Sequence, residues 1–510
     1  MPSYLSPGVY VEEVSSGSKP IEGVGTAVAA FVGFAGKGPL NEAVLVTNWT
    51  QFVETFGQFV EGALLAHSVY GYFLNGGGTA YVVRVGGGSG RPTGQLEGPA
   101  NSRAELPSRG DGRPLVVRAL DGAPAGQPLT VEVHEPSEPG EDVFKLVVKA
   151  GAEEEVFDNV STRRGATNVV NALRKSKWVV AEEVKGATLA VPQPGTSATL
   201  AQAEPEQRPA TVEDYVGDAD ERSGFSGFEA VDDITMLCVP DLMTAYEAGT
   251  IDLDGVKAVQ LAMIAHCELM SDRVAILDAP PGLRPQQIKD WRQNVAGYDS
   301  KYAALYWPWI KVADPSTGKP IVIPPSGHVA GVWARNDETR GVHKAPANEV
   351  IRGVLDLQSS LTRGEHDQLN PIGVNCLRFF PGQGIRIWGA RTLSSDAEWR
   401  YLNVRRLFNY LEKSIIGGTQ WVVFEPNDPF LWSSVERTIG MFLRRVWRTG
   451  ALFGRTPEEA FYVKCDAENN PPENRDAGIL TVDIGVAPVK PAEFIVFRLA
   501  QFGEGTELQE

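Results

Sequence analysis

Three short apolar runs decide the fold: ITMLCV at Ile234–Val239, VAIL at Val274–Leu277 and AALYW at Ala303–Trp307. Residues 252–270 and 284–298 separate these runs and have the apolar spacing of helices. Strands that alternate with helices of this length predict an α/β unit built on a largely parallel sheet.

The first part of the chain predicts further elements of the same core. Ala27–Phe34 and Thr79–Val85 have the composition of strands. Between them, Leu65, Val69 and Tyr72 recur at helical spacing. We therefore expect residues 23–85 to be folded together with the later α/β unit.

The composition changes after a glycine-rich run at residues 86–90. From about 87 to 222 the sequence is rich in Pro, Gly, Glu and Thr, and turn residues separate its short strand candidates. These candidates are Leu115–Leu120, Leu129–His134 and Phe144–Lys149. The pattern predicts a small β-rich domain inserted into the core.

Two amphipathic helices are expected near the C-terminus. Ser395-x-x-Glu398 and Ser433-x-x-Glu436 fit the capping box, in which each side chain binds the other residue's free backbone N–H. The apolar stripe of the second helix consists of Val435, Ile439, Phe442, Leu443 and Val446. Both helices are expected to start close to these serines.

The net charge argues against a nucleic-acid partner, and the hydropathy argues against insertion into a membrane. The 510 residues carry 47 Lys and Arg against 64 Asp and Glu, a net charge of −17. Nucleic-acid binders usually present a basic face, so no nucleic acid is expected as a partner. The longest uncharged apolar stretch, between Glu22 and Lys37, has 14 residues, fewer than the roughly 18 that a membrane span needs. We expect no membrane insertion and, from the polar N-terminus, no signal peptide.

The motifs of nucleotide, metal and cofactor chemistry are incomplete. GFAGKG at 33–38 lacks the first glycine and the Ser or Thr of a phosphate loop, and Gly23-Val24-Gly25 lacks the third glycine of a dinucleotide fingerprint. The four cysteines never occur at CxxC spacing, and the six histidines form no HExxH. The sequence therefore predicts no cofactor, no metal and no enzymatic activity.

A serine-type hydrolase on the α/β core is the alternative. Ser326, His328 and Asp337 are residue types of a catalytic triad. A serine and a histidine two positions apart cannot easily face each other, and no GxSxG elbow accompanies them. The competing interpretation is that Ser326 caps a helix that starts at Gly327.

A basic segment stands out from the acidic chain. Between Arg391 and Arg455 there are ten basic and six acidic residues, a net charge of +4. Arg444, Arg445 and Arg448 lie beside or opposite the apolar stripe of their helix. They present a cationic face to an acidic partner, or they are an ordinary solvated helix face.

Both ends of the chain contain a strand candidate next to a linker. Val9–Val11 lies in an arm of 22 residues, and Glu493–Phe502 (EFIVFRLAQF) follows Pro488 and Pro491. An extended segment of this kind can add itself to an exposed sheet edge of a neighbour. Head-to-tail donation generates rings or open helical filaments. The alternative is that both strands fold back onto the chain's own sheet.

Several longer motifs, in this order along the chain, resemble contractile tail sheath proteins. They are Tyr4–Glu13 (YLSPGVYVEE), Pro324–Val332 (PPSGHVAGV), Gly341–Asn348 (GVHKAPAN), Leu369–Phe380 (LNPIGVNCLRFF), Gly389–Asn409 (GARTLSSDAEWRYLNVRRLFN), Ala460–Asp466 (AFYVKCD) and Pro491–Arg498 (PAEFIVFR). The resemblance covers about 1–85 and 225–510, and the region between has no match.

The resemblance implies an α/β, multidomain sheath subunit. It implies a subtilisin-like α/β core with a C-terminal α+β domain, a β-rich inserted domain and extended N- and C-terminal β arms. The expected division is 1–22 for the N-terminal arm, 23–86 for the first part of the core, 87–222 for the inserted outer domain, 223–368 for the α/β core, 369–490 for the tube-proximal C-terminal domain and 491–510 for the C-terminal arm.

The implied function is structural. Sheath subunits stack as rings with helical symmetry around an inner tube, and contraction drives the tube through a target envelope. The implied partners are further copies of the chain, the inner tube protein, and baseplate and terminator proteins. The subunit is expected to assemble in the bacterial cytoplasm and then to form part of a phage tail or a phage-tail-like injection particle.

The resemblance also assigns residues to two roles. Strands shared between neighbouring subunits are expected at Val9, Tyr10, Val11, Val14, Phe494, Val496, Phe497 and Leu499. The surface that faces the tube is expected at Arg437, Arg444, Arg445 and Arg448.

Overall fold

The computed structural model contains two compact units, and the second interrupts the first along the chain. The first comprises residues up to Val85 and from Ala210 onward, and the second is Gly86–Pro209. The structure describes residues 20–86, 103–109, 113–120, 129–140, 142–150, 153–163, 165, 167–181, 189–200 and 210–497.

The second boundary lies earlier than the residue 222 expected from composition. Residues from Ala210 onward belong to the first unit because Tyr215 is buried in its core. The Tyr215 hydroxyl also donates to the backbone carbonyl of Asp241 at 2.9 Å.

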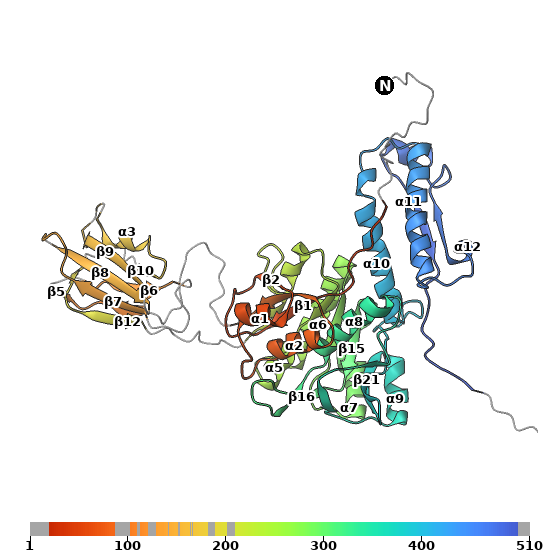
Figure 1. Cartoon of the computed structure of the whole chain (residues 1–510), viewed down its shortest axis with the longest axis horizontal. Helices are drawn as coiled ribbons and strands as arrows, with labels where there is room; N and C mark the ends of the chain where they lie inside the picture. The colour runs from red at the N-terminus through yellow and green to blue at the C-terminus, as the bar shows by residue number, and fades with distance from the viewer. Residues whose placement is uncertain are drawn as a thin grey trace, which may run out of the picture. The chain divides into compact units, whose positions relative to one another are not determined.

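A nine-stranded sheet forms the centre of the first unit (Figure 1). In sheet order its strands are β18 (Glu349–Val350), β21 (Gly384–Ile387), β20 (Val374–Phe380), β15 (Ala303–Trp307), β14 (Val274–Asp278), β13 (Met236–Cys238), β1 (Val28–Gly33), β3 (Thr79–Arg84) and β2 (Ala43–Val46). The inner strands from β20 to β3 are parallel, and β2, β21 and β18 are antiparallel additions at the edges. The three apolar runs that predicted a parallel sheet form the adjacent strands β13, β14 and β15.

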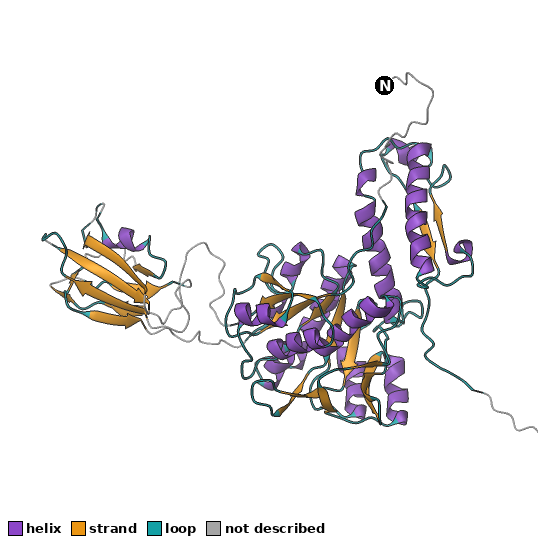
Figure 2. Cartoon of the chain, in the orientation of Figure 1, coloured by secondary structure: helices purple, strands orange, loops and turns teal. Residues whose placement is uncertain are grey.

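Helices cover both faces of this sheet (Figure 2). One face carries α4 (Val212–Val216), α5 (Asp241–Glu247), α6 (Leu253–Met270), α7 (Pro285–Asp290) and α9 (Arg363–Leu369). The other carries α1 (Trp49–Phe56), α2 (Leu65–Leu74) and α8 (Ser326–Arg340). The helix predicted over 284–298 is α7 followed by a π-helical turn at Trp291–Ala296.

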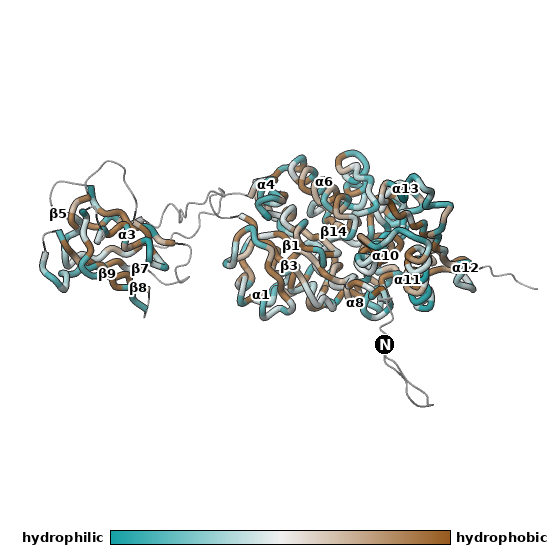
Figure 3. The backbone as a smooth tube through the Cα atoms, turned by 90° about the horizontal axis from the view of Figure 1, so that it is seen from above, coloured by the Kyte–Doolittle hydropathy of each residue, from teal (hydrophilic) through white to brown (hydrophobic). Residues whose placement is uncertain are grey.

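The strand periodicity explains why helices are needed on both sides. In β1, Ala30 and Val32 pack into one apolar cluster, whereas Ala29 and Phe31 pack into the other. Successive strand residues point to opposite faces, so a strand that is apolar throughout must be covered twice. Figure 3 shows the apolar colour along inner strands such as β1 and β3, and polar colour over outer helices such as α4.

A smaller three-stranded sheet lies in the same unit. Its antiparallel strands are β17 (Pro320–Ile323), β16 (Ile310–Ala313) and β19 (Val354–Leu357), with β16 in the middle. The sequence did not predict this sheet, because its strands are only four residues long and show little alternation.

The C-terminal part of the first unit is mostly helical. Its elements are α10 (Leu402–Gly418), α11 (Pro429–Arg448), α12 (Pro457–Ala460), β22 (Phe461–Lys464), α13 (Pro472–Asp476) and β23 (Asp483–Val486). The expected start of this part at residue 369 is too early, because β20 and β21 belong to the main sheet. β20 pairs with β15 in parallel, with Val374 opposite Leu305.

The second unit is β-rich, as its turn-rich composition predicted. Its elements are β4 (Arg103–Glu105), β5 (Ser108–Arg109), β6 (Val116–Ala119), β7 (Leu129–His134), β8 (Val143–Ala150), β9 (Glu153–Ser161), α3 (Val169–Leu173), β10 (Val179–Ala181), β11 (Val191–Pro192) and β12 (Ser197–Leu200). Sheets in the orders β12-β7-β8-β9 and β10-β6-β4 enclose a separate apolar core.

Candidate assembly surface

The helix pair α10–α11 is held together by an apolar core of its own. The predicted stripe on α11, from Val435 to Val446, is buried in it. On the facing side, α10 contributes Leu407 and Leu411. A helix with one apolar face gains stability by burying it, so the two amphipathic helices pack as a hairpin (Figure 1).

Both predicted capping boxes are wrong about where the helices begin. α11 begins at Pro429, and the Asp428 side chain accepts from the backbone N–H of Leu431 at 2.9 Å. Ser433 lies inside the helix. α10 begins at Leu402, and Ser395 instead binds the carboxylate of Asp299. A short Ser-x-x-Glu pattern does not distinguish a helix start from a helix interior or a loop.

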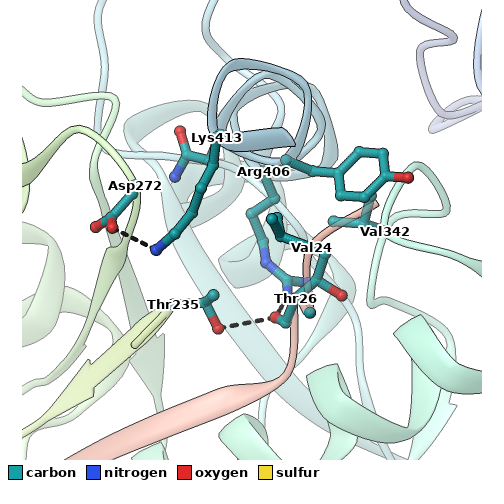
Figure 4. Close-up of a pocket in the computed structure, with 10 residues that line it drawn as sticks. Val24, Thr26, Thr235, Asp272, Val342, Arg406 and Lys413 are labelled. Carbon is teal, nitrogen blue, oxygen red and sulfur yellow. Dashed lines mark hydrogen bonds and ion pairs between the residues drawn. The ribbon is translucent and has the colours of Figure 1, made fainter. Parts of the chain in front are cut away.

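A polar seam fixes α10 to the α/β core. The Arg406 guanidinium makes two hydrogen bonds to the Asp337 carboxylate on α8, at 2.9 and 2.5 Å, and donates to the Thr26 carbonyl at 3.1 Å. Further along α10, Lys413 pairs with Asp272 at 2.6 Å. Figure 4 shows Arg406 and Lys413 reaching from α10 toward this seam. The cavity between them is only about 10 Å³, too small for a ligand, so the seam is structural.

An open groove of about 580 Å³ runs between α11 and β22. Its walls include Met441 from α11 and Tyr462 from β22, which are both exposed. Charged side chains of both signs line it as well, namely Glu436, Arg437, Arg444 and Glu458. Among the described residues β22 has one strand neighbour, β23, so its other edge is unpaired in this chain. A groove of mixed polar and apolar lining beside an unpaired edge can accept an added strand.

The four predicted basic residues on α11 are all exposed but do not act alike. Arg437 and Arg444 line the groove. The Arg445 guanidinium donates to the backbone carbonyl of Ile21, so it holds the segment that follows the N-terminal arm. Arg448, at the end of the helix, does not line the groove. Sequence spacing alone could not separate these positions.

The N-terminal segment enters the fold along α10. Ile21 is buried in the apolar core of the helix pair, and the backbone N–H of Val24 donates to the Ser414 hydroxyl at 3.1 Å. The expected arm residues Val9, Tyr10, Val11 and Val14 lie outside the described residues. The arm bounds of 1–22 stay a prediction, although Ile21 is already packed in the core of the helix pair.

The C-terminal segment contains the most exposed apolar run of the described chain. Phe494, Ile495, Val496 and Phe497 are 73–85% exposed. They form no strand in this single chain, although the sequence predicted one over 493–502, because a strand needs a partner for its backbone groups. Leu499 lies outside the described residues.

The residues of the hydrolase alternative do not form a triad. Ser326 is fully buried at the start of α8, and its hydroxyl donates to the Asp278 carboxylate at 2.6 Å. Burial raises the pKa of Asp278 to about 7. Asp337 is occupied by Arg406, and no described residue bonds to Nδ1 of the buried His328. Ser326 therefore has no histidine as its base, and its burial leaves it without access to a substrate.

Two other kinds of site are absent from the described residues. None of the described helices combines the length and apolar character required to cross a bilayer. Within the same ranges, no three His, Cys, Asp or Glu side chains cluster in a way that suits a metal ion.

The fold defines a mixed α/β protein, and comparison with known proteins defines its family. The model described as "Phage tail sheath protein central domain" matches residues 210–393, and "Phage tail sheath C-terminal domain" matches 394–502. Together they cover more than half of the chain, which therefore belongs to the phage tail sheath protein family.

Individual relatives agree with this assignment. The tail sheath protein of Vibrio phage KVP40 is 32% identical over 192 residues, which is 37% of this chain and 28% of that protein. The chain thus matches only about a quarter of that relative's length. The tail sheath protein of Burkholderia phage BcepMu is 23% identical over 516 residues, covering 96% of this chain and 95% of that protein.

A solved structure has the same fold over nearly the whole chain. It is the helical sheath of the anti-feeding prophage in the contracted state, with 25% identity, a TM-score of 0.58, and coverage of 98% of this chain and 100% of that one. The family and these relatives are structural sheath proteins of contractile tails and not enzymes, so the hydrolase alternative has no support.

Proposed function

We propose that this chain polymerises helically around an inner tube and contracts to drive that tube through a target envelope. The observation that carries the proposal is the exposed apolar run Phe494–Phe497, which finds no partner in the described part of its own chain. A soluble protein rarely leaves such a run in water unless another surface covers it. The groove beside β22 offers the exposed apolar side chains of Met441 and Tyr462 as part of such a surface.

The donated segment is proposed to come from a second copy of this chain. Phe494 and Phe497 supply apolar side chains, and Met441 and Tyr462 of the acceptor groove supply the complementary contact. The unpaired edge of β22 supplies backbone donors and acceptors, which makes the contact tolerant of sequence. A heterologous contact of this type passes from copy to copy and generates rings or open helical filaments.

The N-terminal arm is proposed as the second connector, through Val9, Tyr10, Val11 and Val14. Its base is fixed beside α10 by Ile21, within the same helical part that forms the groove. Each subunit then has two linkers to its neighbours. Linkers of this kind keep subunits joined while their bodies move.

The domains are proposed to follow the family pattern. The α/β core is subtilisin-like, the second unit is an inserted domain that faces outward, and the helical C-terminal part is an α+β domain near the tube. Contraction needs no nucleotide if each subunit contact is more favourable in the contracted lattice, because many small gains then add cooperatively.

The further partners are proposed from the same family. A similar chain was solved within the anti-feeding prophage baseplate, so a baseplate contact is proposed for this chain too. Inner tube and terminator proteins complete the proposed set. The particle is a phage tail or a phage-tail-like injection device, assembled in the bacterial cytoplasm.

Charge reversal on α11 tests the proposed tube-facing surface. Arg437→Glu, Arg444→Glu and Arg448→Glu together are expected to weaken tube binding at least tenfold, because like charges facing an acidic partner cost several kcal/mol. Arg445 is left intact because it holds Ile21. Binding is measured by co-sedimentation of the subunit with purified tube.

Two controls make this test specific. Arg448→Glu alone separates the tube from the groove, since Arg448 does not line the groove; it should weaken tube binding and spare polymerisation without tube. Arg363→Glu, at the exposed start of α9, matches the change in charge elsewhere. Wild-type tube binding by the triple variant would remove this helix face from the tube interface.

A further inference from the structure

The C-terminal segment is held by hydrogen bonds to Glu493, the residue just before its exposed apolar run. The Glu493 carboxylate accepts from Nε and one terminal nitrogen of Arg391, at 2.9 and 2.5 Å, and from Nδ2 of Asn370 at 2.8 Å. The Tyr401 hydroxyl lies 3.4 Å from the same carboxylate. Although burial opposes it, the hydrogen bonds from Arg391 and Asn370 hold the pKa of Glu493 below its ordinary value.

Arg391, which binds Glu493, is itself fixed to the main sheet. The backbone N–H of Arg391 donates to Oδ1 of Asn375 at 2.7 Å, and its carbonyl accepts from Nδ2 of Asn375 at 2.8 Å. Asn375 is fully buried on β20. A bidentate arginine–carboxylate pair on a rigid frame is strong and directional.

The chain is attached at two points before it becomes free. The first is residue 489, where the Val489 N–H donates to the Ala451 carbonyl at 3.2 Å and the Val489 carbonyl accepts from Asn403 at 3.1 Å. The second is Glu493. Beyond it, Phe494–Phe497 are exposed.

We propose that Glu493 and Arg391 form a clip that sets where the C-terminal arm leaves the body of the subunit. The inference rests on the proposed strand donation. With the clip closed, the segment available to a neighbour starts at Phe494. With the clip open it starts after Val489 and is four residues longer, which is about 13 Å of extended chain. The clip therefore fixes the distance over which two subunits are joined.

The clip also determines which part of the subunit bears a force that pulls on the C-terminal arm. A pull on Phe494 passes through the ion pair into β20 of the main sheet. Without the clip it passes to residues 487–489 and then to β23, the strand that pairs with β22 beside the groove. Glu493 is thus a positioning residue that protects the acceptor hairpin of its own subunit from being peeled open.

Hydrogen exchange on the free full-length subunit tests the clip directly. Glu493→Gln keeps the size of the side chain and removes its charge. Hydrogen bonds to charged groups are strong enough that the clip should open far more often in the variant. Val489, whose N–H is bonded to the Ala451 carbonyl, then becomes the last attached residue, so exchange of this N–H should rise severalfold. Glu473→Gln, an exposed residue on α13, is the matched control and should change nothing. The reversed pair Glu493→Arg with Arg391→Glu should restore much of the protection. Unchanged exchange in Glu493→Gln would overturn the proposal.

The assembled sheath tests the positioning role separately. Glu493→Gln subunits retain the apolar run, so they should still polymerise, but with a broader distribution of ring spacings than wild type. Sheaths of wild-type regularity would overturn this role. If the wild-type protein itself forms no sheath, the proposed function fails, and the exchange experiment on the free subunit still decides whether the clip exists.

Discussion

Deletion of residues 494–510 is expected to abolish ordered sheath assembly and to leave the subunit folded. The described part of this segment, Phe494–Phe497, is 73–85% exposed, so its removal takes little from the fold. Burying such side chains against a neighbour contributes about 1.5–3 kcal/mol each, and the contact repeats at every subunit. Electron microscopy measures assembly, and circular dichroism with thermal unfolding measures the fold.

Three companion variants sharpen this prediction. Phe494→Ser with Phe497→Ser should lose assembly without shortening the chain. Leu269→Ser removes a comparably exposed apolar side chain from α6 and should assemble normally. At the other end, deletion of residues 1–19 should also prevent assembly. That deletion stops before Ile21, whose loss would damage the helix-pair core. Ordered sheaths from the 494–510 deletion would show that the segment is no intersubunit strand.

Asp337→Ala is expected to destabilise the subunit by about 3–5 kcal/mol, the usual cost of leaving a buried charge without its partner. Asp337 and Arg406 are both 3% exposed. Arg406 also stacks on Trp333 of α8, 4.7 Å from the ring centroid. Without the carboxylate, the Arg406 guanidinium stays buried between α10 and α8 without its ion-pair partner. Chemical denaturation followed by tryptophan fluorescence measures the change.

An exposed ion pair provides the comparison. Lys311→Ala breaks a pair with Asp356 at 3.0 Å whose side chains are exposed, and should cost at most about 1 kcal/mol. If Asp337→Ala costs no more than Lys311→Ala, the seam does not hold the C-terminal helices on the α/β core.

The α/β centre could be predicted from sequence because its strands are apolar on both faces. AALYW at Ala303–Trp307 is β15 to the residue, and the helix expected over 252–270 is α6. A strand that is apolar on both faces must be covered on both faces in any fold, so its local pattern and its place in the tertiary structure agree. The same holds for the stripe on α11, where helical spacing alone identified the buried face.

The candidate site could be predicted only in part, because its pieces are distant in sequence. Met441 and Tyr462 line the same groove, and Arg391 pairs with Glu493, but no local sequence pattern predicts either arrangement. The basic cluster was visible, but spacing could not show that Arg445 binds Ile21 while Arg437 and Arg444 line the groove. The terminal strand needs a second chain, so one chain shows its residues exposed instead.

Electron microscopy of the purified full-length protein, with and without its tube protein, tests the central claim most directly. The account predicts hollow, striated cylinders whose rings stack with helical symmetry, and tubes enclosed by them when tube protein is present. Dispersed single subunits under both conditions would contradict it.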